Sequence, residues 1–266
     1  MKNPRPFARK RFGQHFLRDR SVLDSIIFHS NLSQEDHVLE IGPGKGALTD
    51  RLLEQCGSVT AVEIDRDLTS DLREKYEGEE RLTLLERDIL KMDWDQLVKE
   101  EETNKIVANL PYNISSPLFF KIVAFRQRFH SIVIMVQKEL ALRIQNDGKG
   151  KKLKDYGILS VIASNLFDVE WIRDVSSACF VPQPKVDSAV IKLTPKPLNI
   201  QNERAFLGFV RRSFNHRRKR LLTHLKNNEP VLYQSMDSDT IETMREYRPE
   251  NLLPSQYLSL FQKGRI

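Results

Sequence analysis

The 266 residues are 40% apolar and 29% charged, an ordinary composition for a globular protein with one sizeable domain and a small second one. No apolar run is long enough to cross a bilayer, and the first residues lack the apolar core of a signal peptide. The two cysteines and six scattered histidines exclude a disulfide framework and offer no metal-ligand spacing. We therefore expect no metal, no membrane partner and a cytoplasmic protein.

Positive charge is concentrated in two segments. Residues 1–20 carry a net charge of +6 and residues 211–226 a net charge of +7, whereas the whole chain carries +6. The rest of the chain is therefore acidic, and focused positive charge on such a body suits a polyanion, because neutralised phosphates release counterions. Two solvated surface runs are the alternative. The candidate polyanion contacts are Lys10, Arg11, Arg211, Arg212, Arg217, Arg218, Lys219 and Arg220.

From residue 37 onward, short apolar runs alternate with helical patterns. The pattern predicts helices at 47–56 and 67–76, and strands at 38–42, 59–63, 82–86, 105–108 and 131–135 and near Val169 and Val190. Strands that alternate with helices form βαβ units with right-handed crossovers. The expected fold class is α/β, with a Rossmann-like, doubly wound and mostly parallel sheet.

Two prolines, Pro195 and Pro197, end this pattern, because neither a central strand nor a helix accommodates them. Helices are predicted at 203–214 and 217–225, the first with an apolar face. We therefore predict a catalytic domain over 1–198, which includes the basic N-terminal segment, and a small helical domain over 199–266. A basic, glycine-containing loop is expected at 147–152.

A glycine-rich turn follows the first predicted strand and opens a helix. Its glycines, Gly42, Gly44 and Gly46, allow a tight turn and a close approach of backbone to ligand. A dinucleotide fingerprint places its third glycine at position 47, where this chain has Ala47, although alanine is sometimes allowed there. The observed spacing, with Glu40 before it, is instead typical of S-adenosylmethionine methyltransferases.

Two acids follow the next two predicted strands. Glu63 could accept hydrogen bonds from both ribose hydroxyls of a cofactor, and Asp88 could accept from the adenine amino group. Each acid alone is more often a surface or capping residue. Ligands of doubly wound sheets bind at the carboxyl ends of the strands, so the consecutive positions favour a cofactor crevice.

The tetrapeptide Asn109-Leu110-Pro111-Tyr112 follows the fourth predicted strand. The exocyclic amine of adenine is a poor nucleophile, because its lone pair is delocalised into the ring. The Asn109 side-chain oxygen and the Leu110 carbonyl could accept both amino hydrogens and direct the lone pair toward a sulfonium methyl group. Pro111 would stiffen the turn, and Tyr112 would stack on an extruded base. The alternative is an ordinary strand-ending turn.

A second aromatic lies in the run Phe180–Ser188. Phe180 could close the base between two rings, with the prolines of this run fixing the loop. Taken alone, a phenylalanine is more often a core residue.

Together these motifs resemble the ribosomal RNA adenine dimethyltransferases of the KsgA type. The resemblance covers almost the whole chain, through 10–17, the glycine turn, 63–65, 109–112, 180–188 and 213–219. It implies a class I methyltransferase that uses S-adenosylmethionine. It also implies dimethylation of two adjacent adenosines in the 3′-terminal hairpin loop of small-subunit (16S) rRNA during ribosome biogenesis. The implied cofactor contacts are His15, Leu17, Gly42, Glu63, Asp88 and Asn109.

The resemblance bears on the remaining expectations as well. Bacterial members usually carry asparagine at position 15, so His15 is a departure that changes one contact, and the Lys149–Lys154 loop is longer than expected. The basic residues would contact RNA phosphates, positioning more than specifying. The expected partner is small-subunit rRNA or a 30S precursor, bound by a monomer.

Alternative functions stay open at this point. A large-subunit rRNA methyltransferase of the antibiotic-resistance type shares the first domain, but the 180–188 run and the basic second domain favour the small subunit. A DNA adenine methyltransferase usually has two adjacent prolines where this chain has Leu110-Pro111. A non-catalytic assembly factor is disfavoured by the retained motif and by the lack of room for a transit peptide before Lys10. A dehydrogenase is disfavoured by the glycine spacing.

Overall fold

The computed structural model describes residues 14–149, 153–197, 200 and 202–264. The strands are β1 (Phe16–Leu17), β2 (His37–Ile41), β3 (Ser58–Glu63), β4 (Leu82–Glu86), β5 (Lys105–Asn109), β6 (Ser131–Gln137), β7 (Phe167–Val175), β8 (Phe180–Val181) and β9 (Ser188–Pro195). The α-helices are α1 (Arg20–Ser30), α2 (Ala47–Gln55), α3 (Arg66–Lys75), α4 (Trp94–Glu100), α5 (Ser115–Phe125), α6 (Lys138–Gln145), α7 (Ile158–Leu166), α8 (Glu203–Phe214), α9 (Leu221–Asn228), α10 (Pro230–Gln234), α11 (Ser238–Thr243) and α12 (Pro254–Lys263). No helix in the described ranges is long and apolar enough to span a membrane.

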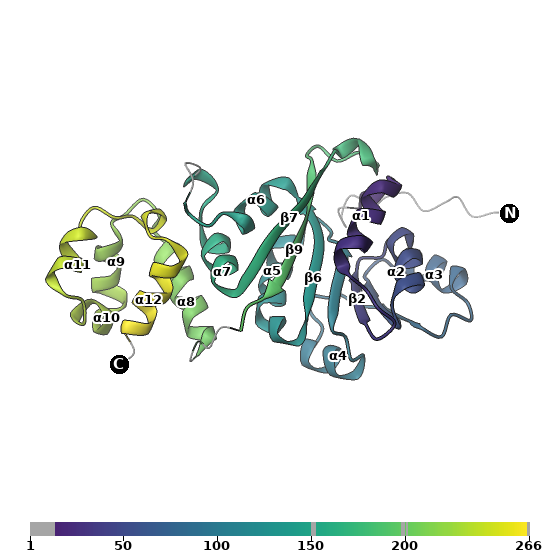
Figure 1. Cartoon of the computed structure of the whole chain (residues 1–266), viewed down its shortest axis with the longest axis horizontal. Coiled ribbons are helices and arrows are strands. Elements are labelled where there is room, and N and C mark those ends of the chain that lie inside the picture. The colour runs from purple at the N-terminus through teal and green to yellow at the C-terminus, as the bar shows by residue number, and fades with distance from the viewer. Residues whose placement is uncertain (1–13, 150–152, 198–199, 201, 265–266) are drawn as a thin grey trace. The chain divides into compact units, whose positions relative to one another are not determined.

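Seven strands form the main sheet in the order β4-β3-β2-β5-β6-β9-β7, and β6, β9 and β7 lie side by side in Figure 1. Strands β2 to β6 pair in parallel, and β9 runs antiparallel to β6. The chain moves outward from β2 to β4 and then returns to place β5 beside β2. This reversal is the switch point at which doubly wound sheets bind ligands. The predicted fold class is confirmed.

Local sequence explains these elements. Parallel strands covered on both faces read as continuous apolar runs, and β2 and β6 are buried along almost their whole length. Aspartates cap four of the described helices: the carboxylates of Asp19, Asp65, Asp93 and Asp237 accept N–H bonds from the first turns of α1, α3, α4 and α11. Because apolar runs and caps define these elements, most of the predicted bounds agree with the observed ones to within one or two residues.

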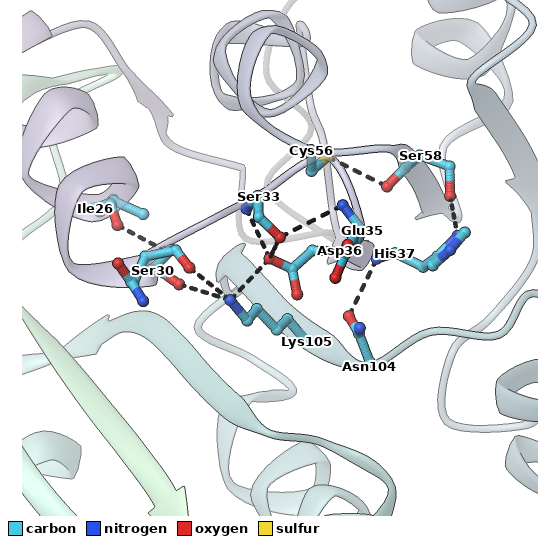
Figure 2. A network of polar contacts seen from close by, with 11 residues as sticks. Ile26, Ser30, Ser33, Glu35, Asp36, His37, Cys56, Ser58, Asn104 and Lys105 are labelled. Carbon is cyan, nitrogen blue, oxygen red and sulfur yellow. Dashed lines mark hydrogen bonds and ion pairs between the residues drawn. The ribbon is translucent and has the colours of Figure 1, made fainter.

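At the edge where the parallel strands begin, the amino-end edge, buried polar groups satisfy one another (Figure 2). Lys105 Nζ lies 2.9 Å from Asp36 Oδ2 and donates to the carbonyls of Asn31 (2.6 Å) and Ser30 (3.4 Å) at the end of α1. The Asp36 carboxylate also accepts from the Ser33 N–H at 2.7 Å. Burial favours the neutral acid, but the Lys105 hydrogen bond and charge hold the pKa of Asp36 below its ordinary value. This network ties α1 to β5.

The backbone forms two compact units: 1–141 with 170–195, and 142–169 with 196–266. The second unit is helical, and its core includes Phe206, Phe209 and Phe261, whose rings lie 5.4–5.9 Å apart in the pairs that involve Phe261. Residues 142–169 group with the C-terminal helices, although the sequence pattern assigned them to the first predicted domain. The boundary predicted at residue 198 falls three residues after the last strand ends.

One predicted helix begins later than expected. The segment 215–219 forms turns between α8 and α9, so the helix predicted at 217–225 starts at Leu221 instead. All six residues from Asn215 to Arg220 are exposed, and no apolar side chain among them could anchor a helical turn to the core. The predicted basic loop at 147–152 lies partly outside the described residues, and Leu153–Asp155 forms a short 3₁₀ turn.

Candidate functional site

A crevice of about 1330 Å³ opens where β2, β3 and β5 end, the carboxyl-end edge of the sheet. It is lined by the glycine turn, by Glu63 and Asp88, by residues 109–114, and by parts of two other segments, 14–18 and 181–182. Ordinary ligand pockets measure roughly 300–1,000 Å³. The crevice therefore has room for more than one small ligand, and it lies at the switch point between β2 and β5.

The glycine turn needs its glycines. Gly42, Gly44 and Gly46 adopt φ angles of 71°, 60° and 77°, a region that side chains disfavour. A Cβ on Gly42 would lie 3.2 Å from the Pro111 ring, and a Cβ on Gly44 would lie 3.2 Å from the Phe16 ring. The turn that follows β2 and the turn that follows β5 are thus in direct contact.

Glu40, the acid before the glycine turn, lines the crevice but is only 1% exposed. Burial raises the pKa of its carboxyl to about 8, with the Glu63 charge adding to the effect, although a 2.6 Å hydrogen bond from Thr49 opposes it. The Glu40 carboxyl is therefore mainly protonated and neutral at pH 7, so it does not pair with a cation.

Glu63 is the last residue of β3 and lies 19 residues beyond Gly44, whose N–H donates to its Oε2 at 3.3 Å. Its Oε1 accepts the N–H groups of Ile64 and Asp65, both at 2.9 Å. Burial raises the pKa of Glu63 above its ordinary value, against these N–H donors, which lower it. Oε2 keeps acceptor capacity on the crevice side, because a carboxylate oxygen has two lone pairs.

Asp88 follows β4 and begins a loop that runs to Met92. Asp88 Oδ1 accepts the Leu90 N–H at 3.0 Å, and the Asp88 carbonyl accepts the N–H groups of Lys91 and Met92. The loop is therefore folded around Asp88, and Asp88, Ile89 and Leu90 all line the crevice.

The tetrapeptide 109–112 leaves β5 at the crevice wall. The Leu110 N–H donates to the Met135 carbonyl at 3.0 Å, which continues the β5–β6 pairing, and the Pro111 carbonyl accepts from Ser115. The Tyr112 hydroxyl lies 2.5 Å from the Ser188 hydroxyl at the start of β9. The turn is thus held by the two neighbouring strands β6 and β9.

The segment 14–17 lines another part of the crevice. Its short strand β1 pairs with β8, and Gln14 donates to the Asp65 carboxylate at 2.8 Å. His15 Nδ1 lies 2.8 Å from the Pro182 carbonyl, which only accepts, so Nδ1 is the donor. The His15 ring stacks on Tyr112 with centroids 5.4 Å apart. Leu17 is buried in the core and reaches the crevice wall.

Phe180 does not reach the crevice. It is 2% exposed, belongs to the main hydrophobic core and pairs with Leu17 between β8 and β1. Alternation along an extended strand turns the next residue the other way, and Val181 and Pro182 line the crevice instead. The structure therefore places Phe180 as a core residue, not as the predicted second ring on a base.

The basic residues of the second unit fall into two groups. Three arginines pair with acids: Arg212 Nε with Glu229 (2.8 Å), Arg217 with Glu250 (3.6 Å) and Arg220 with Glu246 (2.8 Å). Arg218 and Lys219 are exposed and form no ion pair with any described residue, and Arg211 is exposed at the end of α8. Lys10 and Arg11 lie outside the described residues.

The motifs did not indicate every residue of the crevice. Gln14 and Phe16 were not singled out, yet Phe16 packs on Gly44 and lies under Lys45, whose Nζ is 4.8 Å from the ring centroid. Their positions depend on the pairing of β1 with β8, two strands of two residues that lie far apart in sequence. Such short strands leave no periodic signal.

Known proteins match this chain over nearly its whole length. The model of the family described as "Ribosomal RNA adenine dimethylase" matches residues 7–263. A relative named "Ribosomal RNA small subunit methyltransferase A" from Clostridium botulinum (strain Loch Maree / Type A3) is 42% identical over 221 residues, 82% of this chain and 79% of its own. A protein of the same name from Acinetobacter baylyi is 40% identical over 95% of this chain and 91% of its own.

Two solved structures extend the match to the fold. The dimethyladenosine transferase from Plasmodium falciparum aligns with a TM-score of 0.78 and 31% identity, covering 95% of this chain and 99% of that one. The 23S rRNA methyltransferase ErmE aligns with a TM-score of 0.66 and 25% identity, covering 94% and 100%.

Proposed function

The chain belongs to the ribosomal RNA adenine dimethylase family, and from that premise we propose that it dimethylates two adjacent adenosines near the 3′ end of small-subunit rRNA. It is an S-adenosylmethionine-dependent enzyme that acts on adenine in ribosomal RNA. The relatives that align with this chain over most of their own length are named small-subunit methyltransferases, which supports the choice of subunit. We further propose a cytoplasmic monomer that binds 30S precursors.

The crevice residues fit S-adenosylmethionine. The glycine turn would hold the methionine end, since a Cβ at Gly42 or Gly44 would fill the space beside Pro111 or Phe16. The acceptor position that remains on Glu63 Oε2 would take a ribose hydroxyl, and Asp88 would accept the adenine amino group. When bound, the cofactor supplies a methyl group on a sulfonium, which is electrophilic without further activation.

The contact between Gly42 and Pro111 is the observation that carries the proposed mechanism. It places the glycine turn and the Asn109–Tyr112 turn against each other across the switch point. A base held by Asn109 would therefore face a cofactor seated on the glycine turn, and such positioning supplies much of the rate of a transfer reaction.

The residues of the catalytic turn would orient the adenine. The Asn109 side-chain oxygen and the Leu110 carbonyl would accept the two hydrogens of the exocyclic amine, so that its lone pair points out of the ring plane. Tyr112 contacts the Ser188 hydroxyl with its own hydroxyl and His15 with one ring face, and it lines the crevice, so the base would stack on its other face. The nitrogen loses a proton to water after it is methylated, so no neighbouring base is required.

The unpaired cations of the second unit would contact RNA. Arg218 and Lys219 lie at an exposed turn, whereas Arg212, Arg217 and Arg220 are partly neutralised by their acids. Phosphate contacts of this kind position the RNA rather than select its sequence. We assign the RNA contact mainly to Arg218 and Lys219.

The proposed substrate is tested by offering labelled S-adenosylmethionine with undermethylated small subunits, large-subunit rRNA and DNA in parallel. We expect four methyl groups per small subunit, on two adjacent adenosines, and background with the other two. Because ErmE also shares the fold, labelling confined to large-subunit rRNA would overturn the proposed substrate.

The RNA contact is tested in the same system with two pairs of substitutions. Arg218→Ala with Lys219→Ala should weaken binding to small subunits and lower the slope of log K against log salt by about two. The matched pair Arg212→Ala with Arg220→Ala removes the same charge from ion-paired positions and should lower the slope less. Equal slopes for both pairs would contradict the assignment.

A further inference from the structure

The ammonium group of Lys121, on α5, binds main-chain carbonyls at the edge of the crevice. Its Nζ lies 2.7 Å from the Met92 carbonyl oxygen, 2.8 Å from that of Leu90 and 3.3 Å from that of Ile89. An ammonium has three hydrogens, so all of its donors are used. Lys121 forms no ion pair in the part of the chain that the structure describes.

Trp94 completes the contact with the same loop. Its indole N–H donates 3.0 Å to the Ile89 carbonyl, and its ring lies 5.7 Å from Lys121 Nζ. Trp94 is 1% exposed at the start of α4, so its position is fixed by packing. We call Lys121 and Trp94 the carbonyl clamp.

The clamp holds one side of a loop whose other side faces the crevice. Asp88, Ile89 and Leu90 line the crevice, while the carbonyls of Ile89, Leu90 and Met92 turn to the clamp. The loop has no regular pairing of its own beyond the bonds to Asp88. The Asp88 carboxylate accepts the Leu90 N–H at 3.0 Å and lies 3.7 Å from the exposed Lys91 ammonium, while contacts from α4 and α5 hold the backbone of the loop that carries it.

Lys121 also connects the loop to the catalytic turn. Helix α5 begins at Ser115, three residues after Tyr112. Burial lowers the pKa of Lys121 below its ordinary value, and the charges of Asp88 and Asp93 oppose that effect. A charged donor forms stronger hydrogen bonds than a neutral one. Replacing Lys121 by an apolar residue would remove this donor from three carbonyls, of which that of Ile89 keeps the Trp94 N–H.

We propose that Lys121 is a positioning residue that sets the purine specificity of the cofactor site, by fixing the Asp88 carboxylate to accept an adenine amino group. This inference rests on the cofactor role proposed above for Asp88. Lys121 itself does not line the crevice.

The probes are 5′-methylthioadenosine and 5′-methylthioinosine, in which an oxo group replaces the adenine amino group. A carboxylate accepts a hydrogen bond from the amino group and repels the oxo group. Dissociation constants of both compounds are measured by calorimetry on the full chain. We expect the wild type to favour the adenosine compound by about tenfold or more, the range of a hydrogen bond to a charged group.

Lys121→Met should reduce this preference to within about threefold, mostly by raising the dissociation constant of the adenosine compound. A general loss of stability would raise both dissociation constants alike and leave their ratio unchanged. Lys105→Met is the matched control, because Lys105 also binds main-chain carbonyls but at the amino-end edge (Figure 2), so the ratio should stay at the wild-type value. If Lys121→Met does not fold, Lys121→Gln keeps one donor group and should give an intermediate ratio.

Asp88→Ala separates this inference from the one it rests on. If Asp88→Ala abolishes the preference and both folded Lys121 variants keep it, the clamp has no role in specificity and the inference is overturned. If Asp88→Ala keeps the preference, the role of Asp88 and the inference fall together, while the methyl-transfer assay still tests the proposed substrate.

Discussion

The two edges of the central sheet both contain buried charged groups, but they use them differently. At the amino-end edge, Lys105 donates its ammonium hydrogens to Asp36 and to the carbonyls at the end of α1 (Figure 2). At the carboxyl-end edge, Glu63 retains acceptor capacity and the glycine turn leaves space that a side chain would fill. A buried charge therefore indicates a ligand site only when its hydrogen-bonding positions remain open to a cavity.

The same contrast appears in the pKa values. The Lys105 hydrogen bond and charge outweigh burial and hold the pKa of Asp36 below its ordinary value, whereas burial raises that of Glu40 to about 8. One edge thus keeps an ion pair, and the other keeps a neutral acid beside the proposed cofactor.

Breaking the amino-end edge should have the largest effect on stability. Lys105→Met leaves the Asp36 carboxylate buried without its cation, which should lower the free energy of unfolding by about 3–5 kcal/mol. Urea unfolding measures the change. The double variant Asp36→Asn with Lys105→Met removes both charges and should recover part of the loss. A single variant as stable as the wild type would show that this edge is not a closed structural network.

Breaking the carboxyl-end edge should affect activity instead. Asn109→Ala removes one acceptor for the adenine amine and should lower kcat by about 10²- to 10³-fold, with cofactor binding still measurable. Single-turnover transfer to small subunits gives the rate, and calorimetry gives the cofactor affinity. Unimpaired turnover would contradict the proposed role of the Asn109–Tyr112 turn.

The neutral Glu40 carboxyl at the carboxyl-end edge should make the stability of the protein depend on pH. In the unfolded chain the Glu40 carboxyl ionises near the ordinary glutamate value of 4.5, and in the native protein its pKa is about 8. Between these values only the native state holds the proton, so stability should fall as pH rises, by up to about 1.4 kcal/mol per unit, and level off above about pH 8. Glu40→Gln should flatten this slope in urea unfolding from pH 5 to 9. An unchanged slope would assign it to another group.

The smallest effect concerns the support of the glycine turn. The Tyr76 hydroxyl lies 2.9 Å from the Gly46 carbonyl and 2.7 Å from Asp50 Oδ1. Tyr76→Phe should raise the KM for S-adenosylmethionine by about three- to tenfold and leave kcat within about twofold. Tyr156→Phe removes a hydroxyl that donates to the Leu252 carbonyl in the helical unit, and its KM should be unchanged. Equal shifts in both variants would exclude a local role for Tyr76.

The sequence predicts the helices and strands well wherever a local pattern of apolar residues and caps determines their bounds. The bounds of β4 and α8 are as predicted, because an apolar run and an amphipathic face with an Asn202 cap define them. The strand order that the structure shows then brings Gly42 and Pro111 together at the switch point.

The sequence does not reveal contacts that depend on distant segments. Phe180 is fixed in the core by the pairing of β8 with β1, which no periodicity signals, whereas its place in the 180–188 run predicts a contact with the base. Basic residues 217–220 resemble a helical turn in composition, but a helix also requires an apolar anchor that this segment lacks. Lys121 carries no motif, since its role depends on carbonyls that only the folded loop presents.

The pairing of Phe16 with Val181 has a consequence for synthesis. The glycine turn, the acids and the Asn109–Tyr112 turn all emerge from the ribosome before residue 181 does. The part of the crevice formed by the glycine turn and the Asn109–Tyr112 turn can therefore fold before β1 pairs with β8, because contacts between segments so far apart in sequence form late. We expect the affinity for the cofactor to rise abruptly once β8 has been translated and has paired with β1.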